Sequence, residues 1–378
     1  MLPLLLIFVL LAQHALAFPR QHRANEKPLP YSLHDSRDTR SRSYKIPSAV
    51  QNGTSKAQFE IPTPATTLDI ETLFRLDAPQ IDSINNSVFD WWYFDAVSET
   101  NPDDSLVVTF FSSSAEAFPF LDANESSVLT VWLWASFANG TVFYDSVPAT
   151  VATVTGADGA GTNSSGEWSS TGFSWAALTE DLSRYEIIIA SEKLQVEGRL
   201  TLTSNWSDQR FVDSVHSWYW GHGRLGPYSI VWFSYLAMDD PTNATYVSSY
   251  VAKDGEVLVS ACDPSILTVR PIGSPGTTGG RYPPRVGDLP EGFRLEYDLG
   301  EGGGRLEVNV SVRTVVAGDG EYYMRWTGDM VGEVIESESR RPQDVGGGGP
   351  KKEMGERSER SSSSLVGVAV LEQFVMME

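Results

Sequence analysis

The stretch Leu306-Glu307-Val308-Asn309-Val310-Ser311-Val312-Arg313 alternates apolar and polar side chains without a break. Successive side chains of a β-strand point to opposite faces, so this period places the apolar residues on one face and the polar residues on the other. It predicts a half-buried strand with Asn309 on the solvent face. Short apolar runs recur from Phe59 onward between clusters of Gly, Pro, Asn and Asp, and few windows have a helical period. The predicted class is all-β.

The strand predicted over 129–137 differs between its two faces. One face carries Leu129, Val131, Leu133, Ala135 and Phe137, and the other carries Thr130, Trp132, Trp134 and Ser136. An aliphatic face is typical of a core, and a face of tryptophans and hydroxyls suits the wall of a binding cavity. Simple packing of both faces between two layers explains the same pattern, so both interpretations stay open.

A weak internal repeat indicates two related β domains. An aromatic cluster over 90–95 is followed by an apolar run over 107–111, and a second cluster over 217–223 is followed by a run over 230–235. We therefore expect a first domain over 59–205 and a second over 206–378. Residues 18–58 are polar and predict a tail that does not order itself, whereas 338–364, rich in Gly, Ser and charge, predict a flexible insertion within the second domain.

The first seventeen residues have the features of a signal peptide. Residues 1–12 are almost wholly apolar, and Ala15-Leu16-Ala17 supplies the small-x-small cleavage pattern. The apolar run is well short of the ~20 residues that cross a bilayer, so no stable membrane span is expected. Glycosylation sequons favour the same compartment, and they begin at Asn52, Asn85, Asn124, Asn139, Asn163, Asn205, Asn243 and Asn309. We expect the chain to enter the secretory pathway and to reach the outside or a vesicular lumen.

Composition excludes some partners. The net charge of −21 disfavours nucleic acid and anionic membrane surfaces, because both require clustered Lys and Arg. Cys262 is the single cysteine, so no disulfide forms within the chain, and we expect it to be a buried apolar filler. Stability must come from packing, for which 11 Trp, 14 Tyr and 17 Phe supply the bulk. Composition does not indicate the oligomeric state.

The sequence contains no familiar catalytic motif in the context that the motif requires. The segment 221–226 matches the letters of the dinucleotide fingerprint, but Pro227 and a strand follow it where a helix should begin. His216 and His222 are the histidines of the folded region, and no third ligand stands at a recognisable spacing, so we expect no metal site. Asp90 and Asp95 are five residues apart and face opposite sides of their strand, which excludes a glycosidase pair from this strand alone.

Aromatic clusters remain, at 91–94 and at 218–220. Each lies beside polar side chains that can orient a bound group, Asp90 and Asp95 in the first case and His222 in the second. For any single tryptophan, core packing is the more common role. A Trp-Trp-Tyr run places bulk on both faces of one strand, so the clusters together favour a pocket.

Two stretches resemble the fungal Diels-Alderases of polyketide–amino acid hybrid pathways, with the cytochalasan type nearest. They are Phe-Asp-Trp-Trp-Tyr-Phe-Asp-Ala-Val at 89–97 and Ser-Trp-Tyr-Trp-Gly-His-Gly-Arg-Leu-Gly-Pro-Tyr-Ser at 217–229, and the likeness extends from about Phe59 to 368–374. The resemblance implies two lipocalin-like antiparallel β-barrel or sandwich domains with a substrate pocket near their junction. Related domains occur in carotenoid hydratases.

The resemblance also implies an activity, which is the intramolecular [4+2] cycloaddition of a linear polyene polyketide–amino acid intermediate. Such a pericyclic reaction needs no base, covalent adduct or metal, so no cofactor is expected. Holding the chain in its reactive fold can supply up to ~7–11 kcal/mol. A hydrogen bond that strengthens at the activated carbonyl adds roughly 2–4 kcal/mol.

Candidate site residues follow from the clusters and the resemblance. We expect Tyr93, His222 and Tyr228 to be the catalytic hydrogen-bond donors. The expected substrate-binding residues are Asp90, Trp92, Asp95, Trp132, Trp134, Trp218, Trp220, Trp232 and Trp326.

One departure from the family pattern lies before Asn205-Trp206. The family has a longer segment there, ending in a stretch with Gly and His-Asp, whereas here 200–204 runs straight into the Asn-Trp pair. This predicts that strands of the first domain are missing. Two other functions compete with the cycloaddition: a terpenoid or carotenoid hydratase or isomerase, whose general acid would be Asp90, Asp95 or His222, and a non-catalytic carrier of hydrophobic metabolites.

Overall fold

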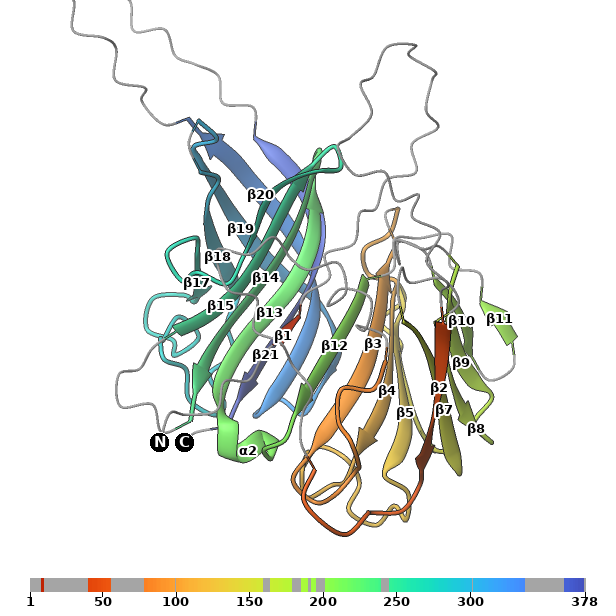
Figure 1. Ribbon diagram of the computed structural model, residues 1–378. Helices are drawn as coiled ribbons and strands as arrows, with labels where there is room; N and C mark the ends of the chain where they lie inside the picture. The colour runs from red at the N-terminus through yellow and green to blue at the C-terminus, as the bar shows by residue number, and fades with distance from the viewer. Residues whose placement is uncertain are drawn as a thin grey trace, which may run out of the picture.

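The computed structural model describes residues 8–9, 40–55, 78–98, 100–158, 164–178, 185–189, 192–194, 201–238, 245–300, 302–336 and 364–376. It confirms the all-β class, because every sheet is antiparallel and the helix α2 (Phe211–Ser214) is the only one in those ranges. Figure 1 shows two bodies of strands side by side, joined through β12 and α2.

The first body is a sandwich of two six-stranded sheets. In spatial order, one sheet consists of β1 (Phe8–Val9), β12 (Thr201–Ser207), β3 (Phe89–Val97), β4 (Ser105–Ser113), β5 (Leu129–Ser136) and β6 (Val142–Pro148). The other consists of β11 (Glu192–Leu194), β10 (Tyr185–Ile189), β9 (Phe173–Ala177), β8 (Ser165–Ser169), β7 (Val151–Asp158) and β2 (Arg40–Pro47).

Aromatic side chains fill the space between these two sheets. Trp92 of β3 packs edge-on against Trp168 of β8, with ring centroids 5.4 Å apart, and both are fully buried. The Trp168 indole N–H donates to the Phe111 carbonyl at 3.0 Å, so this large ring is also satisfied as a polar group. The core is therefore made by the even-numbered face of β3, which carries Trp92 and Phe94.

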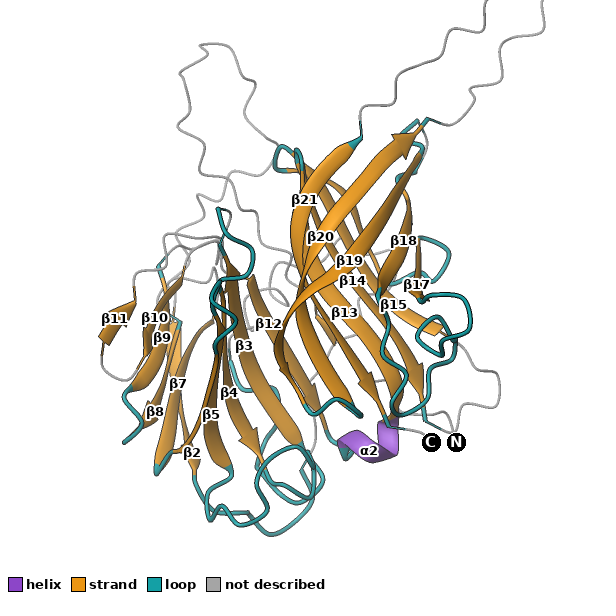
Figure 2. Cartoon of the chain, turned by 180° about the vertical axis from the view of Figure 1, so that it is seen from behind, coloured by secondary structure: helices purple, strands orange, loops and turns teal. Residues whose placement is uncertain are grey.

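The second body is one nine-stranded sheet. Its strands, in spatial order, are β16 (Glu256–Ala261), β15 (Thr245–Lys253), β14 (Tyr228–Ala237), β13 (Val215–Leu225), β21 (Leu365–Val375), β20 (Tyr323–Ile335), β19 (Arg305–Gly318), β18 (Gly292–Asp298) and β17 (Leu267–Ile272). Figure 2 shows this sheet curling from behind. A hydrogen bond across the curled sheet joins β18 to β14: the buried Tyr297 hydroxyl donates to the Val231 carbonyl at 3.0 Å.

Two glycines of β13 make room inside this curled sheet. A Cβ on Gly221 would lie 2.2 Å from the Trp232 ring, and one on Gly223 would lie 2.3 Å from the Met330 sulfur. The glycines that resemble a dinucleotide fingerprint are thus explained by close packing within a strand. No phosphate-binding turn exists at this position, because β13 continues through Leu225.

The bodies meet along β3. Its odd-numbered face, with Phe89, Trp91 and Tyr93, joins a hydrophobic cluster that includes Trp218 and Trp220 of β13. Because the even-numbered face packs into the sandwich, β3 is covered on both sides. Its side chains are buried from Phe89 to Asp95.

Several sequence-based expectations can be compared with this fold. In β19, Leu306, Val308 and Val310 are buried and Asn309 is exposed, so the predicted alternation is confirmed. The prediction of an unordered tail over 18–58 is wrong for part of that range. Residues 40–47 form β2, which pairs with β7 along its whole length and buries Ile46.

Cys262 does not fill the core as expected. It follows the edge strand β16 and is exposed. Other expectations lie wholly or mostly outside the described residues: the signal peptide over 1–17, of which only Phe8–Val9 is described, the insertion over 338–364, and the sequons at Asn163 and Asn243. The altered segment before Asn205 is described only from residue 201 onward.

One buried carboxyl group gives the fold a pH dependence. Asp90 of β3 is fully buried, its Oδ2 accepts from the Gln80 backbone N–H at 2.8 Å, and its Oδ1 has no partner among the described residues. Burial raises the pKa of Asp90 to about 8, while hydrogen bonds from the backbone of Gln80 and Trp91 oppose the shift. In the folded chain the group is therefore neutral at pH 7.

We predict that Asp90→Asn removes a pH dependence of stability. Between about pH 4 and pH 8 the folded wild type holds a proton that the unfolded chain has lost. This carboxyl therefore lowers the unfolding free energy by up to about 1.4 kcal/mol for each pH unit gained. Urea unfolding of both proteins is measured from pH 4 to pH 9. The unfolding free energy of the wild type minus that of the variant should show this slope against pH. Asp145→Asn, on the exposed strand β6, controls for loss of a surface carboxyl, and parallel profiles of wild type and Asp90→Asn would contradict the prediction.

Candidate active site

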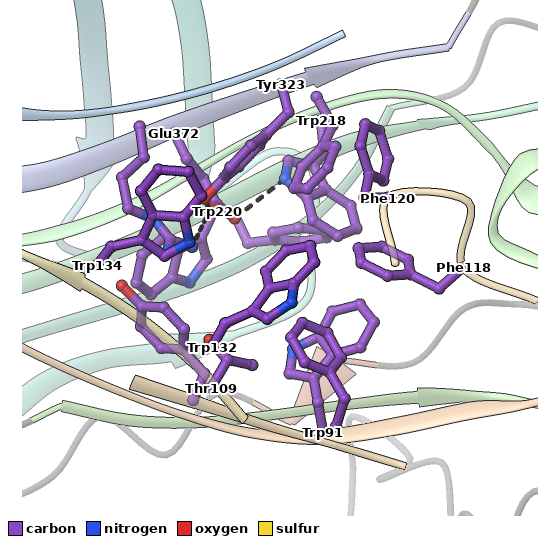
Figure 3. A pocket seen from close by; sticks show the side chains of 15 residues that line it. Trp91, Thr109, Phe118, Phe120, Trp132, Trp134, Trp218, Trp220, Tyr323 and Glu372 are labelled. Carbon is purple, nitrogen blue, oxygen red and sulfur yellow. Dashed lines mark hydrogen bonds and ion pairs between the residues drawn. The ribbon is translucent and has the colours of Figure 1, made fainter. Parts of the chain in front are cut away.

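A pocket lies where the two bodies meet (Figure 3). It holds about 590 Å³ of empty space, a volume that includes open solvent at its mouth. Its lining residues are Trp91, Tyr93, Thr109, Phe111, Phe118, Phe120, Trp132, Trp134, Trp218, Trp220, Phe233, Tyr323, Arg325, Glu372 and Phe374. Most of them are aromatic, so the pocket suits a hydrophobic, largely unsaturated molecule.

One wall comes from the first body. Tyr93 of β3 pairs across the ladder with Thr109 of β4, and Thr109 pairs with Trp132 of β5, so these three side chains form a row on one face of the sheet. Trp134 extends this wall and packs against Tyr144 with ring centroids 4.1 Å apart. The tryptophan-and-hydroxyl face of β5 thus faces the pocket, while Leu129, Val131 and Leu133 face the sandwich core.

The opposite wall is a row of cross-strand neighbours in the second body. Phe233 of β14 pairs with Trp220 of β13, Trp220 with Glu372 of β21, and Glu372 with Arg325 of β20. Because these residues are cross-strand neighbours, the Glu372 carboxylate and the Arg325 guanidinium lie side by side within an aromatic wall. Figure 3 shows Glu372 among the rings of Trp218, Trp220 and Tyr323.

Glu372 and Arg325 form a buried ion pair through Oε2 and Nη2, and their side chains are 7% and 8% exposed. The Trp218 indole N–H also donates to Glu372 Oε1 at 3.2 Å, and the Tyr323 hydroxyl lies 3.5 Å from Oε2. Burial raises the pKa of Glu372, and the charge of Arg325 acts against this shift. For Arg325, burial lowers the pKa, but Glu372, Tyr323, Tyr93 and Asp95 together outweigh this effect, so the pKa lies above its ordinary value and the guanidinium stays charged.

A second polar group crosses the junction beside the first. The Tyr93 hydroxyl donates to Asp95 Oδ2 at 2.5 Å. His222 Nε2 of the other body lies 2.8 Å from Asp95 Oδ1 and 2.9 Å from Oδ2. Asp95 is fully buried, whereas the His222 side chain is 16% exposed. The three groups form a line from the pocket wall toward solvent.

Arg325 connects the two polar groups. Its guanidinium carbon lies 4.4 Å from the centroid of the Tyr93 ring, within cation–π range. Burial raises the pKa of the Tyr93 hydroxyl well above its ordinary value. Arg325 opposes the shift, and the charge of Asp95 adds to it. Tyr93 is therefore a neutral hydrogen-bonding group at the pH of a cell.

Five of the candidate site residues from the sequence line the pocket: Tyr93, Trp132, Trp134, Trp218 and Trp220. Asp95 and His222 are hydrogen-bonded to that wall through Tyr93. The structure thus brings together side chains of β3, β5 and β13, although β3 and β13 are more than a hundred residues apart in the sequence.

Five other candidates lie outside the pocket, because they face the interiors of the two bodies. Trp92 and Asp90 are on the even-numbered face of β3, within the sandwich. Tyr228, Trp232 and Trp326 belong to the core enclosed by the nine-stranded sheet. The parity of each strand position decides this outcome, since a shift of one residue turns a side chain to the opposite face.

Arg325 and Glu372 are the main pocket residues that sequence reasoning missed. Each is the only charged side chain in its stretch of mostly apolar residues, 322–326 and 365–374 respectively. An isolated charge in a buried strand costs free energy unless it is paired, so that pattern was an available signal for a site. Phe118 and Phe120 come from the connection between β4 and β5, which carries no strand period.

Comparison with known proteins gives the chain a family. A family model described as Diels-Alderase-like matches residues 62–205. The quinolone epoxide rearrangement protein asqO of Emericella nidulans is 30% identical over 313 residues, which are 68% of this chain and 79% of that protein. The chain belongs to the Diels-Alderase-like family. A second relative, the quinolone epoxide rearrangement protein penF of Penicillium thymicola, is 28% identical over 60% of this chain and 76% of its own length.

A solved structure shares the fold of this Diels-Alderase-like chain. The crystal structure of CghA with Sch210972 superposes with a TM-score of 0.62, over 89% of this chain and 98% of that one, at 12% identity. Among the described residues, no group of three His, Cys, Asp or Glu side chains is arranged to hold a metal ion. No helix within those ranges has the length and apolar character to cross a membrane.

We predict that Glu372→Gln destabilises the fold by about 3–5 kcal/mol, because it leaves the Arg325 charge buried without its partner. Chemical denaturation at pH 7 measures the difference. The control is Glu307→Gln, which removes a carboxylate that pairs with the half-exposed Arg294 and Arg305 and should cost no more than about 1 kcal/mol. Equal losses for the two variants would contradict a buried, mutually dependent pair.

Proposed function

We propose that this chain is an isomerase that holds one hydrophobic molecule in the pocket between its two bodies and rearranges it with help from a proton donor in the wall. The observation that carries this proposal is the Tyr93 hydroxyl, set in an aromatic wall and bonded to the buried Asp95. Two relatives of the chain are named for the rearrangement of quinolone epoxides, which supports the same reaction class.

Polar groups in an aromatic pocket support catalysis over passive storage. A buried charge or hydroxyl is unfavourable unless it is paired, and a carrier of hydrophobic molecules gains nothing from it. Here Glu372, Arg325, Tyr93 and Asp95 are all buried at or beside the pocket and all paired. Groups with perturbed pKa values in a cleft are a common property of catalytic sites.

The reaction we favour is the rearrangement of an epoxide. The epoxide oxygen accepts the Tyr93 proton as one carbon–oxygen bond breaks, and positive charge develops on the carbon that loses oxygen. The faces of Trp91 and Trp220 stabilise this cation through their π electrons. An internal bond or nucleophile then migrates to the cationic carbon, and the rearranged cation loses one proton, so the product is an isomer of the substrate.

The second candidate is the intramolecular [4+2] cycloaddition of a linear polyene polyketide–amino acid intermediate, including the cytochalasan type. The favouring observation is the aromatic lining on both sides of the pocket, which restricts a flexible polyene to few folded shapes. In this reaction Tyr93 would donate a hydrogen bond to the dienophile carbonyl and no proton would be transferred. Neither reaction requires a cofactor, so we propose that the enzyme works without one.

We also propose that the chain works in a secretory or vesicular lumen. The apolar leader and the sequons support this location. The side chains of Asn52, Asn124, Asn139 and Asn309 are exposed and accessible for a glycan. Removal of glycans by an endoglycosidase should increase the gel mobility of the secreted protein if those sites are used.

A panel of substrates tests the proposal. Purified protein is incubated with a quinolone that carries an epoxide side chain and, separately, with a linear polyenyl pyrrolone, and products are compared with enzyme-free controls by mass spectrometry and NMR. We expect an isomer of equal mass from the epoxide. A cyclised isomer from the polyene alone would transfer the assignment to the cycloaddition. Addition of water to either compound, or tight binding without turnover, would overturn the isomerase proposal in favour of a hydratase or a carrier.

We predict that Tyr93→Phe lowers kcat by about 10²-fold, because it removes the donor hydroxyl and leaves the ring in place. Steady-state kinetics with the accepted substrate measures the loss. Tyr297→Phe is the matched control, since it also removes one buried hydroxyl with one hydrogen bond, but inside the second body. A normal kcat and product ratio in Tyr93→Phe would remove this hydroxyl from the reaction.

A further inference from the structure

We infer that Asp95 and His222 form a proton relay that connects the Tyr93 hydroxyl in the pocket with solvent. The inference rests on the proposed function and adds to it the route by which the reactive proton enters and leaves the site. In this arrangement Tyr93 touches the substrate and is the catalytic residue. Asp95 and His222 act through it and are positioning residues.

The geometry of the three groups is that of a continuous hydrogen-bonded path. The Tyr93 hydroxyl and the His222 ring both contact Asp95, at 2.5 Å and at 2.8–2.9 Å, so each proton transfer is over one hydrogen bond. Tyr93 and Asp95 are both buried, and exposure rises only at the outer end of the path. The Asp95 side chain is at 0% and that of His222 is at 16%, which gives the imidazole access to solvent at the outer end.

The inner end of the path requires such a connection. Burial disfavours the tyrosinate form of Tyr93, and the neighbouring Asp95 adds to this effect. A hydroxyl of this kind can give its proton to a substrate only if another proton replaces it in the same step. Among the described residues, the group that its hydroxyl contacts is Asp95.

The phenolic proton turns from Asp95 to the substrate oxygen and is transferred to it. In the same step the proton of the His222 imidazolium moves to Asp95 and a carboxyl proton of Asp95 moves to the phenolic oxygen, so Asp95 ends as the carboxylate that it was at the start. The imidazole is reprotonated by water. When the rearranged cation loses its proton, an equal number of protons returns to solvent, so the cycle consumes none.

Charged groups from every strand packed around the relay set its electrostatics. Asp95 comes from β3, His222 from β13, Arg325 from β20 and Glu372 from β21. Arg325 and Glu372 neutralise each other, so the relay works beside a pair with no net charge. The alternative role for the Asp95–His222 bond is a clasp between the two bodies, since it joins residues that are 127 apart in sequence.

The variant His222→Gln distinguishes a proton relay from a purely structural bond between the two bodies. A glutamine Nε2 can still donate to Asp95, so the clasp survives, but the amide does not pick up a proton from water. We expect kcat to fall about 10²-fold with little change in KM. The pH–rate profile of the wild type should have a limb that the variant lacks. The matched control is His216→Gln on the same strand, whose ring contacts Ser217 and stands outside the path.

A second variant measures the relay without relying on the glutamine. His222→Ala should be as slow as His222→Gln, and added imidazole should restore part of its rate, with a steeper recovery at lower pH. Thermal unfolding of all variants checks that they are folded at the assay temperature.

The outcomes distinguish the two proposals. If the wild type converts a substrate of the panel and His222→Gln keeps its rate and pH profile, the bond is a clasp and the relay is overturned, while the isomerase assignment stands. If the wild type converts no substrate of the panel, both proposals fail together. A slow His222→Gln with a normal pH profile and no rescue of His222→Ala by imidazole also overturns the relay.

Discussion

The burial of β3 on both faces is the constraint on which the rest of the structure depends. Its even-numbered side chains complete the aromatic core of the sandwich, and its odd-numbered side chains form the junction with the second body. A strand that is apolar on both faces cannot sit at a surface, so a second layer must cover it. The pocket exists because that second layer, the sheet of β13, β21 and β20, contributes large rings that leave space between them. Fold and site are therefore two results of one packing arrangement.

Electrostatics within this junction are shaped by the burial of the paired groups. The Arg325–Glu372 pair and the Tyr93–Asp95–His222 line lie within one aromatic cluster, where an isolated charge would be costly. Pairing on neighbouring strands lowers that cost and fixes the orientation of each group. The low polarity of the surrounding rings strengthens the interactions of these groups with one another. An apolar wall and a set of paired polar groups are thus compatible in the same cavity.

The sequence alone was sufficient for the class of fold and for much of the aromatic wall. Alternation in β19 and the two-faced composition of β5 are local properties, so they predict buried faces without knowledge of distant residues. The position of Tyr228, Trp232 and Trp326 inside the second body depends on which parity of each strand faces inward, and an aromatic run gives no local signal for that choice. The contact between Arg325 and Glu372 depends on the pairing of β20 with β21, which the chain reaches only after a long connection. The sequence did not predict strand 40–47, because an edge strand can be polar when backbone pairing with a neighbouring strand, here β7, stabilises it.

The position of β21 in the second sheet bears on how the molecule assembles. It is the last described strand in the chain, yet it lies between β13 and β20 at the centre of the sheet and brings Glu372 and Phe374 to the pocket. During synthesis the aromatic faces of β3 and β13 leave the ribosome well before the strand that completes their junction. Until β21 inserts, Arg325 has no carboxylate partner and the two bodies cannot close around the cavity. Completion of the pocket and completion of the second sheet are therefore one event, which must wait for the synthesis of β21.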